Sequence, residues 1–222
     1  VLNGGSPMLL NAYLHFRMEM NSGSVLGYLL QSLPIACLAG IVFFAVRFAV
    51  LKKRHAPIHW PSEMLRVLFA CYLAGLISLI VLPANFWLAV YDGIFLGFWD
   101  EMGPVFQFGG VNLVPSAVKC LKGELVLGSW VKQMLIGNAA MFVPFGFFLP
   151  ILTRIRRVKG IALAAAVVPL CFESAQLFFG RSLDADDLIC NAIGIVIGAM
   201  IAHVILRAKS AALNRTALRR RT

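Results

Sequence analysis

Four polar side chains interrupt long apolar stretches in the C-terminal half of this 222-residue chain. They are Asn138, Glu173, Gln176 and Asn191. A carboxylate can act as a general acid or base or bind a cation, and amides donate and accept hydrogen bonds. Polar groups are costly in hydrocarbon, so they usually face a protein interior and mark a functional site or a packing contact.

A second polar group follows Glu173 in the chain and gives it charged neighbours: Arg181, Asp184, Asp186 and Asp187. The three aspartates could bind a divalent cation, or they could cap the next helix, whose N-terminus favours acidic residues. Arg181 could reach back toward Glu173. Because the Cys and His residues show no metal-ligand spacing, the sequence predicts no resident metal and no cofactor.

The composition indicates which elements position these residues. The chain is 60% hydrophobic and only 14% charged, which is typical of an integral membrane protein. A membrane-crossing helix needs about 20 largely apolar residues. Five runs qualify, at Leu26–Leu51, Leu65–Leu82, Met134–Leu152, Ile161–Phe179 and Leu188–Leu206. The predicted fold is therefore all-α, a polytopic membrane protein with about five transmembrane helices.

The distribution of charge predicts how these helices are oriented. Of the 20 basic residues, 15 lie at the connection of the first and second helices, between the third and fourth, and after the fifth, together with only one of the 10 acidic residues; the 15 include Arg47 and Arg66, in the helix ends beside the first connection. Since basic residues accumulate in cytoplasmic segments, the N-terminus is expected outside and the C-terminus in the cytoplasm. This topogenic pattern accounts for the net charge of +10, so nucleic acid is not expected as a partner.

Three regions follow from this topology: an extracytoplasmic segment at 1–25, a helical membrane domain at 26–206 and a basic cytoplasmic tail at 207–222. The long outer connection includes Phe86–Trp99, which is aromatic but too short to cross, so we expect it at the membrane interface. Short loops join the last three helices, which predicts a tight antiparallel series.

Depth and helical phase bring the polar residues together. At about 1.5 Å per residue, all four intramembrane polar residues fall in the outer leaflet. Asp187, Asn191, Gly194 and Gly198 share one face of the last helix, and the two glycines allow a neighbouring backbone to approach closely. Pro144 should kink its helix and open a polar cleft toward the outer face.

The motifs that carry these residues also occur in a known family. In order, they are Asn112-Leu-Val-Pro115, Gly137-Asn138, Phe142-Val-Pro144-Phe-Gly146, Glu173-Ser-Ala-Gln176, Gly180-Arg181, Asp184-Ala-Asp186-Asp187 and Asn191-Ala-Ile-Gly194 with Gly198. Together they resemble the VanZ-like family over about residues 110–206. The chain departs from the family pattern at Ser116, where an aromatic residue commonly follows the proline.

The resemblance implies a multi-pass protein of the bacterial cytoplasmic membrane, in a family named for glycopeptide resistance of the teicoplanin type. Two hypotheses remain open. In one, an outer-leaflet polar cleft binds or shields an amphiphile, such as a lipid-linked envelope precursor or a lipoglycopeptide, with membrane lipid as the general partner. In the other, an enzyme acts on such a precursor with Glu173 as general acid/base. A purely structural role for Glu173, holding helices in register, is the alternative to both.

Overall fold

The computed structural model describes residues 7–83, 85–126 and 128–219. The first six residues of the expected outer segment and the last three of the basic tail lie outside the described residues. The chain is all-α apart from two short strands, and five of its helices are long and apolar enough to cross a membrane. It forms two compact units, Val1–Gly110 with Ala175–Ser182, and Val111–Ser174 with Leu183–Thr222.

The first unit contains four helices and a short 3₁₀ turn. They are α1 (Pro7–Met20), α2 (Val25–Lys53), α3 (Trp60–Ile80), α4 (Phe86–Leu96) and η1 (Trp99–Glu101). Ser24 caps α2 by accepting a hydrogen bond from the Gly27 backbone N–H, and a proline stands in the first turn of α3, where no N–H is needed. The loop that follows α7 also belongs to this unit and forms an isolated parallel bridge between Gln107 and Phe179.

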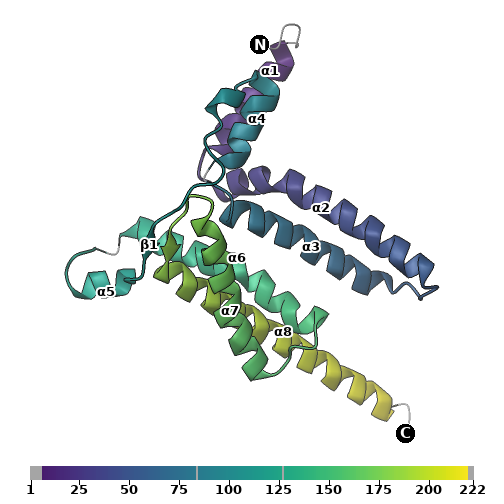
Figure 1. Cartoon of the computed structure of the whole chain (residues 1–222). Coiled ribbons are helices and arrows are strands. Elements are labelled where there is room, and N and C mark those ends of the chain that lie inside the picture. Colours follow the sequence, from purple (N-terminus) through teal and green to yellow (C-terminus); the bar gives the residue numbers. More distant parts are fainter. Residues whose placement is uncertain (1–6, 84, 127, 220–222) are drawn as a thin grey trace. The chain divides into compact units, whose positions relative to one another are not determined.

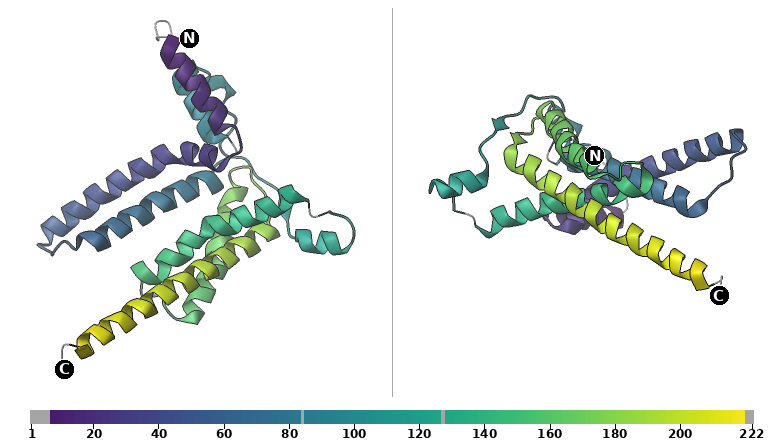
Figure 2. Two further views of the ribbon diagram at one scale, coloured as in Figure 1. Left: turned by 180° about the vertical axis from the view of Figure 1, so that it is seen from behind. Right: turned by 90° about the horizontal axis from the view of Figure 1, so that it is seen from below.

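Helices α2 and α3 pack side by side as an antiparallel hairpin (Figures 1 and 2). Gly40 of α2 lies against Cys71, and Gly75 of α3 lies against Ser32, so positions later in α2 meet positions earlier in α3. Near the loop that joins them, Arg47 donates to Glu63 at 2.8 Å. This ion pair satisfies a carboxylate that is buried between the helix ends.

The second unit contains β1 (Val111–Asn112), α5 (Ser116–Leu121), α6 (Ser129–Leu152), most of α7 (Val158–Leu177), β2 (Leu183–Asp184) and α8 (Ala185–Arg219). The two strands pair in parallel, with Asn112 opposite Asp184. Helix α6 continues as one helix through Pro144 and Pro150. These two residues therefore leave the predicted membrane crossing intact.

The closest helix pair of the second unit is α6 with α8, which lie side by side in both views (Figures 1 and 2). A β-carbon at Gly194 would overlap the backbone oxygen of Ala139, and one at Gly198 would overlap that of Val143. Gly146 makes the reciprocal contact with the backbone of Ile195. The predicted glycine stripe is therefore buried against a neighbouring helix, and that helix is α6.

The closest pair among the last three helices is α6 with α8, whereas the sequence predicted tight contacts between consecutive helices; their parallel course is what helices alternating in direction require. Gly194 of α8 meets Ala139 of α6, and Gly198 meets Val143, so residue numbers increase in the same direction along both helices. Helices α6 and α8 are therefore parallel. Helix α7 lies between α6 and α8 in the sequence. It contacts α6 through larger side chains: Phe172 is edge-on to Phe142, with ring centroids 5.3 Å apart. In the α6–α8 pair, glycines at the contact allow the backbones to approach closely.

Each of the five predicted crossings corresponds to a helix long and apolar enough to cross a membrane, with small shifts at its ends. These helical segments are Leu26–Lys53, Trp60–Ile80, Val131–Leu152, Val158–Leu177 and Ala185–Ala212. Two helical features were not expected. Residues Pro7–Met20 form α1 in the segment before the first crossing, and α8 continues through most of the basic tail to Arg219.

Candidate functional site

Four acidic residues of the second unit gather around the N-terminus of α8, and we call them the carboxylate cluster: Glu173, Asp184, Asp186 and Asp187. Asp184 caps the helix, because its Oδ1 accepts the backbone N–H of Asp186 at 2.8 Å. Glu173 comes from α7, has no exposed surface, and accepts the backbone N–H of Asp184 at 3.0 Å through Oε2. The cluster therefore joins α7 to the start of α8.

The β1–β2 pairing brings an amide to this cluster. Because Asn112 lies opposite Asp184 in the parallel register, its Nδ2 donates to Asp184 Oδ2 at 2.8 Å. Lys119 Nζ donates in turn to Asn112 Oδ1 at 3.1 Å. The Lys119 ammonium is thus linked to the carboxylate cluster by two hydrogen bonds through the Asn112 amide.

Asp186 connects the cluster to the short helix α5. Its two carboxylate oxygens accept the backbone N–H of Ser116 at 3.1 and 2.9 Å. Pro115 precedes Ser116 and has no backbone N–H. The Ser116 N–H is therefore the first at the start of α5 that needs an acceptor. The carboxylate of Asp186 supplies it, and the exposed Asp186 surface falls to 7%.

Two amides extend the polar network along the α6–α8 contact. Asn138 Nδ2 of α6 donates to Asp187 Oδ1. Asn191 lies one turn after Asp187 on the glycine-bearing face of α8 and is only 3% exposed. Its Oδ1 accepts no hydrogen bond from any residue that the structure describes. An acceptor in this position is costly unless a donor reaches it.

Seven of the nine residues singled out in the sequence thus lie in the second unit: Asn112, Asn138, Glu173, Asp184, Asp186, Asp187 and Asn191. The other two, Gln176 and Arg181, belong to the first unit. There the Gln176 carbonyl accepts the Arg181 N–H at 3.1 Å. The Arg181 guanidinium donates to the Leu79 carbonyl at 3.1 Å, which ties the loop after α7 to the end of α3.

Two of the three aspartates, Asp184 and Asp186, cap helices. Among residues 7–83, 85–126 and 128–219, no group of three or more His, Cys, Asp or Glu side chains is arranged to hold a metal ion. Asp184 and Asp186 already accept backbone N–H groups at the starts of α8 and α5. The capping alternative therefore accounts for Asp184 at the start of α8, whereas Asp186 caps the earlier helix α5, which the sequence did not predict.

Sequence reasoning missed Lys119 and the backbone of Ser116. Both lie on α5, which carries no strong helical pattern, and the strands that position Asn112 are only two residues long. The available signal was weak: Lys119 is one of two lysines in the connection between α4 and α6, which also holds three acidic residues. It could have suggested a partner for a carboxylate but not which one.

Comparison with known proteins identifies the family. The family model described as VanZ/LLP1 matches residues 69–207, well over half of the chain. The chain belongs to the VanZ/LLP1 family. This confirms the resemblance drawn from the motifs, and the match begins in α3, ahead of the first motif residue at 110.

The VanZ/LLP1 match contains every residue of the carboxylate cluster and both amides that contact it. Helices α1 and α2 precede it. No curated protein and no solved structure matches the chain.

Proposed function

We propose that this VanZ-like membrane protein binds or shields an amphiphilic envelope component through the carboxylate cluster and its amide neighbours. The recognised group is a hydrogen-bond donor, and an ammonium fits best. The observation that carries the proposal is the buried Asn191 Oδ1, which has no donor among the described residues. A lipid-linked envelope precursor or a lipoglycopeptide would be an amphiphile of the required kind.

The energetic argument begins with that acceptor. Leaving a buried oxygen without a hydrogen bond costs about 1–3 kcal/mol, so a ligand that donates to it recovers this free energy on binding. Asn191 also follows Asp187 by one helical turn, and the carboxylate cluster surrounds the same helix end. A donor that carries positive charge would therefore be favoured over a neutral one.

The direction of access follows from the charge distribution. We propose that the three basic segments lie in the cytoplasm, with the C-terminus, and that the N-terminus lies outside. The N-terminal end of α8 then falls at the outer side of a bacterial cytoplasmic membrane. An amphiphile whose acyl chains lie in the outer leaflet could present its polar group there.

The enzyme hypothesis is supported by one observation, the complete burial of the Glu173 carboxylate. A carboxylate held in such surroundings can serve as general acid or base toward a lipid-linked precursor. Two of the neighbouring aspartates, Asp184 and Asp186, accept backbone N–H groups as helix caps. These two aspartates therefore supply no nucleophile–base pair. Binding without reaction accounts for the arrangement with fewer assumptions.

The test uses the purified full chain in lipid nanodiscs with two probes, a fluorescent long-chain amine and the matching long-chain carboxylic acid. We expect the wild type to bind the amine in preference to the acid. Glu173→Gln should keep expression and melting temperature but weaken amine binding about tenfold, equivalent to about 1.4 kcal/mol. The matched control is Glu124→Gln, which makes the same change at an exposed acid outside the cluster.

Asn191→Leu provides the second arm. It removes the unsatisfied acceptor and keeps a branched side chain of four heavy atoms, so the free protein should melt at the same or a higher temperature while amine binding weakens. Asn138→Ala should give a smaller loss. Wild-type amine binding in well-folded Glu173→Gln and Asn191→Leu would refute the proposal and leave the cluster as a packing device.

A further inference from the structure

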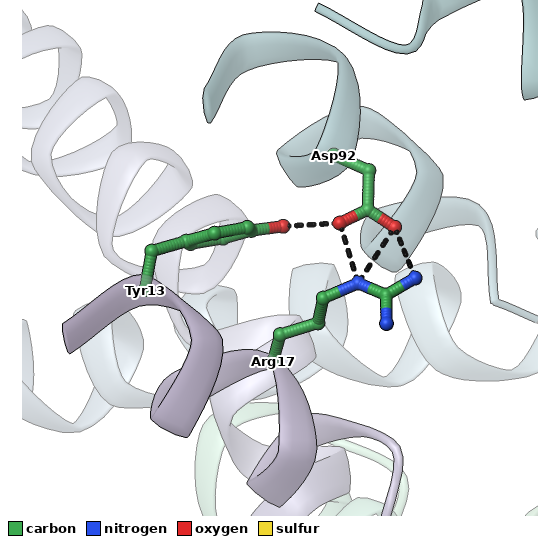
Figure 3. A network of polar contacts seen from close by, with 3 residues as sticks. All are labelled: Tyr13, Arg17 and Asp92. Atoms are coloured by element: carbon green, nitrogen blue, oxygen red, sulfur yellow. Dashed lines mark hydrogen bonds and ion pairs between the residues drawn. The ribbon is translucent and has the colours of Figure 1, made fainter. Parts of the chain in front are cut away.

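A second polar network lies in the first unit, where α1 and α4 pack against each other. Tyr13 stacks on Phe95 with ring centroids 4.6 Å apart, and Phe16 meets Tyr91 edge-on at 5.7 Å. Later positions in α1 meet earlier positions in α4, so the two helices are antiparallel. Between them lies the network of Tyr13, Arg17 and Asp92 shown in Figure 3.

The opposite charges of Arg17 and Asp92 form an ion pair, which Tyr13 joins through a hydrogen bond. Arg17 Nε donates to Asp92 Oδ1 at 2.7 Å and Nη2 to Oδ2 at 3.0 Å, while the Tyr13 hydroxyl donates to Oδ1 at 2.6 Å. Asp92 and Tyr13 are each only 5% exposed. Burial by itself would raise the pKa of Asp92, but the hydrogen bonds and the Arg17 charge outweigh it, so this pKa is lowered.

The outward surface of the pair is apolar in a defined sector. On α1, Leu10, Leu14 and Met18 recur every four residues and are 40%, 41% and 62% exposed. Asn11 and His15 are also exposed and lie beside this stripe. A helix with such adjacent apolar and polar sectors is typical of a segment lying in a membrane interface.

Helix α4 and the residues just after it also expose apolar side chains. Ile94 is 56% exposed, and beyond the helix end Phe98 and Trp99 are 47% and 52% exposed. Tryptophan is favoured at the boundary between hydrocarbon and water. The polar side chain of Asp92 on this helix is turned inward to Arg17.

Chain connections hold both helices at one end of the α2–α3 hairpin. Residues 21–24 link α1 to the start of α2, and residues 81–85 link the end of α3 to α4. Gln31 Nε2 donates to the Met20 carbonyl at 2.9 Å, and Trp87 Nε1 donates to Ser78 Oγ at 2.6 Å. Because α2 and α3 are antiparallel crossings, both links emerge at the same membrane boundary.

We propose that α1 and α4 form one unit seated in the membrane interface, with the stripe of Leu10, Leu14 and Met18 against lipid acyl chains. The occupant of this apolar sector is lipid because α1 leads through a four-residue link into the crossing α2, whose first turns also expose apolar side chains, Leu26 at 54% and Leu29 at 56%. Arg17 compensates the charge of the buried Asp92 carboxylate, so this acid enters the layer as one partner of an ion pair. The proposal is independent of the ligand proposed for the carboxylate cluster.

The test measures which solvent reaches each side of α1. The full chain, with its native cysteines replaced, carries a single spin label at Leu14 or at His15 in proteoliposomes. Collision with oxygen reports lipid, and collision with a water-soluble nickel chelate reports water. We expect Leu14→Cys to favour oxygen by several-fold over its neighbour and His15→Cys to favour the nickel chelate.

Each other outcome overturns the proposal. Equal nickel access at both positions would place α1 in water. Protection of position 14 from both reagents would mean that protein, such as a second copy of the chain, covers the stripe. Oxygen preference at both positions would mean that α1 is immersed in hydrocarbon. Labels at Met18→Cys and Asn11→Cys repeat the comparison, so a local defect at one site cannot decide the result.

Discussion

Adding one methyl group at Gly198 should destabilise the protein, although the intrinsic preference of helices favours the opposite. In an uncrowded helix, Gly→Ala stabilises by up to about 1 kcal/mol. At Gly198 a β-carbon would overlap the backbone oxygen of Val143 and lie 2.6 Å from the backbone nitrogen of Phe147. Ordinary contact begins at 3.4 Å, so the Phe147 contact alone requires 0.8 Å of separation, from 3.4 − 2.6.

The size of the effect follows from that separation. A gap of about 0.5–1 Å forfeits a quarter to a half of the dispersion attraction between packed atoms, and overpacking typically costs about 1–3 kcal/mol. For a protein of this size, each kcal/mol lowers the melting temperature by roughly 2–4 °C. Gly198→Ala should therefore melt roughly 2–12 °C below the wild type, and Gly198→Leu lower still.

The assay is thermal unfolding of the purified full chain in detergent, followed by intrinsic fluorescence. Gly137→Ala is the matched control, because Gly137 lies in α6 with open space around its would-be β-carbon. It should melt at or slightly above the wild-type temperature. Ile197→Leu, at a half-exposed position beside the stripe, should change little. Gly198→Ala as stable as Gly137→Ala would refute the close approach of α6 and α8.

Three further predictions concern topology and the α1–α4 pair. A cysteine at Glu124 should react with an impermeant thiol reagent in intact cells and one at Arg157 should not; the reverse pattern would invert the proposed orientation. Arg17→Met or Asp92→Leu alone should cost about 1–3 kcal/mol in thermal melts, and the double variant should cost less than their sum; strict additivity would mean that the pair is not coupled. Because the Asp92 pKa is lowered, its contribution is present above its ordinary pKa of 3.8 and is lost as pH falls through the lower folded value. The Tyr13 pKa is raised, mainly by burial, so its contribution is present below its ordinary pKa of 10.0 and is lost only at higher pH. Acid titration of hydrogen exchange in α1 should show this step in the wild type and not in Asp92→Asn.

Much of the fold follows from local composition. A run of apolar residues long enough to cross hydrocarbon must form a helix, because only a helix satisfies all of its backbone groups within one segment. The stripe of Gly194 and Gly198 was also predictable as a contact, since helical spacing alone places these residues on one face. Its partner was not, because α6 and α8 are separated in sequence by α7 and meet in parallel.

The candidate site shows a similar division. The polar types and their helical phases pointed to Glu173, Asn138 and Asn191. The hydrogen-bond partners depended on two strands too short to be recognised, whose register places Asn112 opposite Asp184. Lys119 joins the site by donating to Asn112, which that pairing places, and no sequence motif marked this lysine.

The sequence by itself determined five apolar helices, their approximate ends, the family and the residues that would be costly in lipid. These properties depend on neighbouring residues along the chain and on transfer from water to hydrocarbon. Only the tertiary structure decided that Asp184 and Asp186 cap different helices and that Arg17 of α1 pairs with Asp92 of α4. Such pairs join residues far apart in sequence, and their formation depends on packing between segments that no local pattern encodes.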